Sequence, residues 1–151
     1  MKDLKSVEIL LVEDNPRDAE LTIRALKKHD LADHLFHVTD GAEALDFIFM
    51  RGKYKEMKTG HPHPLKVILL DLKIPKVNGL EVLRALKTDE QTQTIPVVIV
   101  TSSTEDPDMQ TAYELGANSY IVKPVQFDAF IDAMTRLGTY WLRVNHPPVG
   151  G

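Results

Sequence analysis

Short aliphatic runs rich in β-branched residues alternate along this chain with longer segments of helical period. Three of these runs, at residues 7–12, 67–70 and 97–100, have the composition of strands that are buried on both faces. Weaker runs at 35–39 and 120–122 bring the expected strands to five. The alternation predicts an α/β fold in which helices cover a parallel sheet.

Helix-start signals follow the expected strands. Asn15 can cap the first helix, and Pro16 suits its first position because no amide hydrogen is needed there. Asp40 and Glu43 have the spacing of a capping box for the second helix. The third, fourth and fifth helices are expected over residues 78–90, 106–115 and 126–143. The result is a flavodoxin-like (βα)5 chain, a doubly wound five-stranded sheet with strand order 2-1-3-4-5.

Length and composition limit the function classes. The 151 residues are enough for one domain with a substantial core, so we expect a single domain over 1–151, with its core at about 7–142 and a short tail at 143–151. No apolar run approaches the ~20 residues of a membrane helix, and the start lacks a signal peptide, so we expect a cytoplasmic protein with no membrane partner. The net charge of −4 gives no electrostatic reason to expect nucleic acid.

One segment, at 51–64, fits none of the expected elements. Its two glycines and two prolines predict an exposed loop that is longer than most connections. His61 and His63 stand beside prolines within it, and we interpret them as surface histidines rather than metal ligands.

Three carboxylates stand where the first and third strands end. The crevice of an open parallel sheet lies beyond the carboxyl ends of its strands, and strand order 2-1-3-4-5 places it between strands 1 and 3. Glu13, Asp14 and Asp71 would therefore meet there. Two such charges ~4 Å apart repel by about 4 kcal/mol at an effective dielectric constant of ~20, and a hard dication removes that cost. We expect Mg²⁺, and we expect Asp71 to be a nucleophile toward phosphate.

Two further polar groups end the fourth and fifth strands. Lys123 supplies a compact positive charge, and the Thr101 hydroxyl can donate a hydrogen bond to a phosphoryl oxygen. Together with the carboxylates, these groups are the side chains that a magnesium-dependent phosphoacceptor needs.

This set of residues resembles the receiver domain of two-component response regulators, which has the CheY-like fold. The residues that carry the resemblance are Glu13, Asp14, Asp71, Pro75, Gly79, Thr101, Lys123 and Pro124. The resemblance implies that Asp71 accepts phosphate from the phosphohistidine of a sensor kinase. It also implies that Asp14, Asp71 and the backbone carbonyl of Lys73 bind Mg²⁺, with Glu13 acting through water.

The same resemblance implies a conformational switch. Thr101 moves toward the phosphoryl group, and the ring of Tyr120 swings inward behind it. The bond between Lys123 and Pro124 is expected to be cis, against a base rate of only ~5% for bonds before proline. The protein would not be an enzyme beyond its own phosphoryl transfer and dephosphorylation.

Two further features are the long segment at 51–64 and the aromatic end formed by Tyr140, Trp141 and Leu142. They resemble the stand-alone regulators associated with phytochromes, and this resemblance makes a phytochrome kinase the expected partner. Only nine residues follow Leu142, so output is expected through binding of an unknown downstream protein. We expect a homodimer through the face formed by helix 4, strand 5 and helix 5, with Tyr140 and Val144 exposed at the end of helix 5. Trp141, by contrast, continues a core stripe of Phe127, Phe130, Met134 and Leu137.

Three other functions share parts of this pattern. A pseudo-receiver would serve only as a phosphorylation-independent interaction module, but it usually lacks an acidic or lysine position that this chain retains. A flavodoxin wants small and hydroxyl residues where Glu13 to Pro16 stand. A phosphatase of the haloacid dehalogenase type wants a second aspartate where Lys73 stands.

Overall fold

The protein is described by a computed structural model that covers residues 4–57, 65–124 and 126–148. Five parallel strands form one sheet in the order β2-β1-β3-β4-β5, which confirms the predicted flavodoxin-like topology. The strands are β1 (Ile9–Val12), β2 (Leu35–Val38), β3 (Val67–Leu70), β4 (Val97–Thr101) and β5 (Ser119–Val122). No helix in the described part of the chain is long and apolar enough to cross a bilayer.

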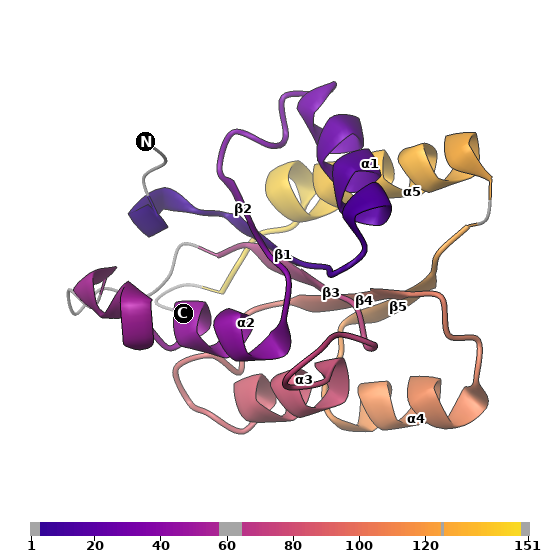
Figure 1. The fold of residues 1–151 in the computed structure, drawn as a ribbon. Coiled ribbons are helices and arrows are strands. Elements are labelled where there is room, and N and C mark those ends of the chain that lie inside the picture. Colours follow the sequence, from indigo (N-terminus) through magenta and orange to yellow (C-terminus); the bar gives the residue numbers. More distant parts are fainter. Residues whose placement is uncertain (1–3, 58–64, 125, 149–151) are drawn as a thin grey trace.

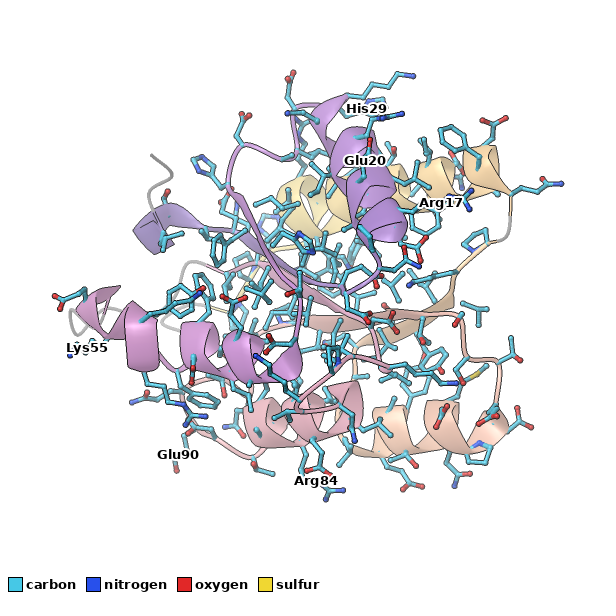
Figure 2. All side chains as sticks on the ribbon, viewed as in Figure 1. Arg17, Glu20, His29, Lys55, Arg84 and Glu90 are labelled. Carbon is cyan, nitrogen blue, oxygen red and sulfur yellow. The ribbon has the colours of Figure 1, made fainter. Side chains whose placement is uncertain are left out.

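Helices cover both faces of the sheet (Figure 1). The helices are α1 (Pro16–Lys27), α2 (Gly41–Ile48), α3 (Gly79–Lys87), α4 (Asp106–Glu114) and α5 (Phe127–Thr139). Helices α1 and α5 pack together on one face, and α2, α3 and α4 lie on the other. Charged side chains such as Glu20 of α1 and Arg84 of α3 point outward from these layers (Figure 2).

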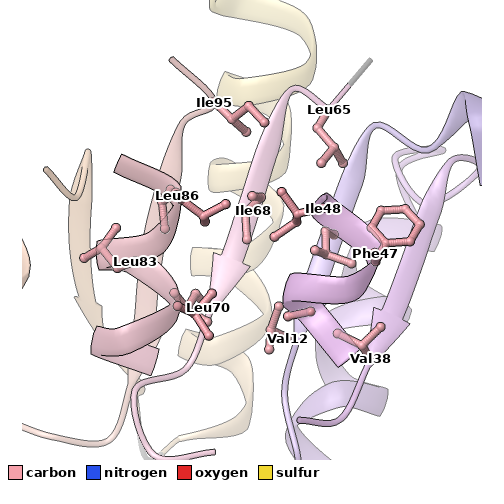
Figure 3. Close-up of a cluster of buried hydrophobic side chains, with 14 of the residues drawn as sticks. Val12, Val38, Phe47, Ile48, Leu65, Ile68, Leu70, Leu83, Leu86 and Ile95 are labelled. Carbon is pink, nitrogen blue, oxygen red and sulfur yellow. The ribbon is translucent and has the colours of Figure 1, made fainter. Parts of the chain in front are cut away.

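The alternation of side chains along the central strands divides the core into two parts. Leu10 and Ile68 belong to the cluster under α2, α3 and α4, whereas Ile9 and Val67 belong to the cluster under α1 and α5. Figure 3 shows the first cluster, in which side chains of α2 and α3 meet those of β1 and β3. All four residues of β1 and of β3 are buried, which explains why their sequences show no polar alternation.

Side-chain caps begin three of the helices. The Asn15 carboxamide oxygen accepts hydrogen bonds from the amides of Arg17 and Asp18, so the predicted start of α1 is confirmed. Asp40 and Asn78 cap α2 and α3 in the same way. Helix α4 begins at Asp106, as predicted, and its N-cap residue Glu105 makes no side-chain cap bond.

Several predicted details differ from the structure. Helix α3 ends at Lys87 rather than at residue 90, and α5 gives way after Thr139 to a π-helical turn, η3 (Tyr140–Val144). Phe127 is 45% exposed, so its assignment to the core was wrong, because it lies in the first turn of α5 and the buried stripe begins at Phe130. The described residues contain no cis peptide bond, so the cis bond expected before Pro124 is not observed.

The first part of the segment after α2 packs against the core. Residues Gly52–Met57 form a short 3-10 helix, η2, and Tyr54 within it is only 5% exposed. The Tyr54 ring packs edge-on against Phe36 and Phe47, and its hydroxyl donates a hydrogen bond of 2.9 Å to Glu43. This part is therefore a short helix and not the predicted loop, and the predicted exposure is confirmed for residues 51–53, 55 and 56 but wrong for Tyr54. Residues 58–64, which include His61 and His63, lie outside the described residues.

Candidate functional site

The parallel register places the ends of four strands along one edge of the sheet. Val12 pairs with Leu70, Leu70 pairs with Ile99, and Thr101 pairs with Val122. The residues that follow these strand ends continue the ladder. For example, the Asp71 amide donates a hydrogen bond of 3.1 Å to the Val12 carbonyl, and the Lys123 amide one of 2.7 Å to the Thr101 carbonyl.

The three predicted carboxylates gather at this edge. Glu13 and Asp71 are 4% and 7% exposed, whereas Asp14 faces solvent. One oxygen from each of the three carboxylates lies within 4.8 Å of the others. Such a group of oxygens suits a hard dication, which relieves the repulsion between them.

The Lys123 ammonium lies among these carboxylates. Its Nζ atom is 2.7 Å from Glu13 Oε1, 2.9 Å from Asp71 Oδ2 and 2.9 Å from Asp18 Oδ2. An ammonium group has three hydrogens to donate, so these contacts use all three. The Lys123 side chain is 10% exposed, and water therefore weakens the ion pairs less than it would at the surface.

The pKa values of Glu13 and Lys123 are both raised, although burial alone acts on the two groups in opposite directions. The pKa of Glu13 is raised to about 7, because burial and the neighbouring Asp71 charge, which raise it, together outweigh the hydrogen bond from Lys123, which lowers it. Burial lowers the pKa of Lys123, but hydrogen bonds to Glu13, Asp18 and Asp71 outweigh burial and raise it above its ordinary value. Lys123 is therefore charged at neutral pH, and added positive charge near Glu13 would favour the ionised form of that carboxyl group.

Asp18 is a site residue that the sequence reasoning missed. A negative charge at the start of a helix is already explained by its favourable interaction with the helix dipole. The sequence spacing does not distinguish that role from a role in the site. The signal that could have found it is topological, because the first turn of the helix after β1 lies beside the crevice.

Thr101 and Tyr120 meet at the backbone of one residue. Thr101 is fully buried, and its hydroxyl oxygen accepts a hydrogen bond of 3.4 Å from the Ser103 amide. The Tyr120 hydroxyl donates one of 3.2 Å to the Ser103 carbonyl, so the ring is turned toward the β4–α4 connection. Ser103 in turn donates a hydrogen bond of 2.6 Å from its own hydroxyl to Asp108 in α4. The end of β4, β5 and α4 are thus joined through Ser103.

The connection after Asp71 is tight. The Lys73 amide donates a hydrogen bond of 3.3 Å to Asp71 Oδ1, and the Gly79 amide donates one of 2.8 Å to the Leu72 carbonyl. A Cβ atom at position 79 would collide with the Asp71 carbonyl oxygen, so glycine permits this close approach.

Comparison with known proteins gives a consistent family. A model of the response regulator receiver domain matches residues 9–135. The response regulator Rcp1 of Synechocystis sp. is 34% identical over 134 residues, which cover 89% of this chain and 88% of Rcp1. The crystal structure of its Mn²⁺-bound form has a TM-score of 0.84 at 33% identity, with coverage of 94% of this chain and 99% of that chain.

Two further solved structures are similar over nearly the whole chain. The phosphorylated cyanobacterial phytochrome response regulator RcpA has a TM-score of 0.86 at 32% identity and covers 94% of this chain and 98% of its own. The bacteriophytochrome response regulator RtBRR is 49% identical with a TM-score of 0.72, covering 95% of this chain and 85% of its own. These matches do not favour the pseudo-receiver interpretation. The chain therefore belongs to the response regulator receiver domain family and is a response regulator of phosphorylation-dependent two-component signalling.

Proposed function

We propose that Asp71 is the phosphoacceptor, and the observation that carries the proposal is its buried carboxylate, held 2.9 Å from the Lys123 ammonium and beside Glu13 and Asp14. In the transfer, an Asp71 oxygen forms a bond to phosphorus. The bond between phosphorus and the histidine nitrogen of a kinase breaks, and its electron pair stays on the imidazole. Lys123 is placed to contact the transferred group, and the Thr101 hydroxyl is available to donate a hydrogen bond to it.

We propose Mg²⁺ as the cofactor. Asp14, Asp71 and the Lys73 carbonyl would hold it, with Glu13 acting through water, and the carboxylates gathered within 4.8 Å are the observation that fits a hard cation. When bound, the cation neutralises charge on the carboxylates and on the phosphoryl oxygens. The Mn²⁺-bound form of Rcp1 and a magnesium-bound receiver domain of the sensor kinase PA1611 support this choice.

The same relatives support a proposal for the partners. We propose that a sensor histidine kinase of the phytochrome class supplies the phosphate in the cytoplasm, because Rcp1-type and bacteriophytochrome regulators are similar along most of this chain. We propose a single receiver domain over 1–151, with output by binding of a downstream protein and not of nucleic acid. Its chemistry would be limited to its own phosphorylation and dephosphorylation.

Replacement of the phosphoacceptor tests the site. We expect Asp71→Asn to abolish the mass increase that acetyl phosphate and Mg²⁺ produce in the wild type, because the amide is not a nucleophile toward phosphorus. Intact-mass spectrometry is the measurement. The matched control is Asp132→Asn, which removes a carboxylate that is 63% exposed on α5 and should label like the wild type. Equal labelling of Asp71→Asn would exclude Asp71 as the acceptor.

We propose that Thr101 and Tyr120 form the switch. Because the Ser103 backbone bonds to both side chains, movement of Thr101 toward a phosphoryl group acts on the same residue that holds the Tyr120 hydroxyl. The Ser103 hydroxyl carries that displacement to Asp108 on α4. Phosphate would stabilise one of two arrangements of this connection, as any ligand-driven change requires.

Thr101→Ala separates phosphorylation from this response. We expect the variant to accept phosphate from acetyl phosphate while losing most of the phosphate-induced change in the amide chemical shifts of α4, because the alanine cannot contact the phosphoryl group. NMR spectra recorded with and without phosphodonor measure the change. Thr104→Ala, at an exposed position of the same connection, is the control and should respond like the wild type. An undiminished response in Thr101→Ala would remove Thr101 from the mechanism.

We also propose a homodimer through the α4–β5–α5 face. Exposed apolar side chains support it: Tyr113 of α4 is 50% exposed, and Phe127, Tyr140 and Val144 along α5 and η3 are 45%, 47% and 57% exposed. Trp141, by contrast, is partly buried and packs against the core under α1 and α5. Aromatic and aliphatic groups exposed together are typical of a partner surface.

Sedimentation tests this interface. We expect the wild type to be dimeric at tens of micromolar and a Tyr140→Ala, Val144→Asp double variant to dimerise at least about tenfold more weakly, since the variant loses apolar contact and buries a charge. Arg24→Ala on the exposed side of α1 is the control and should not change the association. A wild type that remains monomeric with and without phosphodonor would contradict the dimer.

A further inference from the structure

We propose that Asp18 is a positioning residue for phosphorylation, which acts by holding the Lys123 ammonium at the phosphoryl site from α1. The inference rests on the proposed roles of Asp71 and Lys123. It assigns a function to a residue whose charge at a helix start otherwise needs no special explanation.

The contact itself is short and enclosed. Asp18 Oδ2 lies 2.9 Å from Lys123 Nζ, and the two side chains are 23% and 10% exposed. An ion pair shielded in this way is coupled more strongly than a surface pair, such as that of Glu20 and Arg24, whose side chains are 67% and 61% exposed.

Asp18 differs from Glu13 and Asp71, the other two partners of Lys123, in the further interactions that the proposed reaction requires of each residue. Glu13 and Asp71 belong to the group of carboxylates that suits a cation, and Asp71 must also receive the phosphoryl group. Asp18 is not a member of that group. When Glu13 and Asp71 interact with a cation and a phosphoryl group, Asp18 is the carboxylate that can still accept a hydrogen bond from Lys123.

The backbone of Asp18 is fixed at both of its polar groups. Its amide donates a hydrogen bond of 3.1 Å to the Asn15 side chain, and its carbonyl accepts one of 2.8 Å from the Thr22 hydroxyl. Helix α1 is packed against α5, where a Cβ atom on Gly138 would collide with Leu26. The carboxylate therefore projects from a rigid element.

A fixed anion matters because lysine is flexible. Its ammonium group ends a four-carbon stem that can adopt many rotamers, and each contact that holds it lowers the cost of placing its charge at a phosphoryl oxygen. Loss of Asp18 would leave Lys123 with only the two carboxylates that the reaction itself engages. The expected consequence is slower phosphoryl transfer with little effect on cation binding.

The test uses Asp18→Asn in the full chain. We expect its initial rate of phosphorylation by acetyl phosphate, measured by intact mass at saturating Mg²⁺, to fall about threefold to tenfold, as expected for a lost charge-assisted hydrogen bond. Its Mg²⁺ affinity, measured by calorimetry, should stay within about twofold of the wild type. Asp18→Glu keeps the charge and should recover most of the rate. The control Glu20→Gln removes a carboxylate of the same helix that points to solvent (Figure 2) and should leave the rate unchanged.

A double-mutant cycle identifies the route of the effect. If Asp18 acts through Lys123, then Asp18→Asn should lower the rate of the wild type but not the rate of Lys123→Ala. A rate for Asp18→Asn equal to that of the wild type would overturn the inference, and so would an undiminished loss in the Lys123→Ala background. Persistent labelling of Asp71→Asn would instead indicate failure of the proposed phosphoacceptor, so the two failures are distinguishable.

Discussion

The ion-pair cluster around Lys123 is the interaction on which the rest of the site depends. Parallel pairing brings the ends of β1, β3 and β5 to one edge, where Glu13, Asp18 and Asp71 each lie within 3 Å of the same ammonium. One positive charge cannot neutralise these carboxylates and Asp14 as well. Repulsion of several kcal/mol between neighbouring carboxylates makes the crevice receptive to a cation and to the dianionic group that a cation accompanies. In the proposed function, this excess of negative charge links the fold to phosphoryl transfer.

We propose that a second, smaller network transmits phosphorylation to the surface. Thr101 is buried at the end of β4 and cannot contact a partner itself, but Ser103 joins it to Tyr120 and to Asp108 on α4. The α4–β5–α5 face carries exposed Tyr113 directly beside this connection, with its ring 6.5 Å from that of Tyr120. A short displacement at the strand end therefore has a continuous path of contacts to an apolar surface. These hydrogen bonds and the contact between the two tyrosine rings join the polar crevice to the exposed side chain of Tyr113.

Much of this could be predicted from sequence, because local rules and topology agree. The apolar run at 67–70 has the same bounds as β3. Asn15 caps α1, as its residue type indicated. The predictions that were wrong depended on three-dimensional contacts that the sequence pattern does not specify. Helical period placed Phe127 on the core face of α5, but it could not indicate that the first turn of the helix leaves that face exposed. The composition of 51–64 is typical of a loop, but Tyr54 within it packs against Phe36 of β2 and Phe47 of α2. The turn residues give no sign of these contacts. Asp18 was missed because one carboxylate can serve both a helix dipole and an ammonium 105 residues away.

Calorimetric titration with Mg²⁺ tests the central claim most directly, because it measures whether the charge excess forms a cation site before any phosphate arrives. The account predicts that the wild type binds one Mg²⁺ and that Asp14→Ala, which removes an exposed carboxylate of the cluster, binds at least about tenfold more weakly. Asp33→Asn, at an exposed position outside the cluster, should bind like the wild type. Equal binding by wild type and Asp14→Ala, or no binding by either, would contradict it.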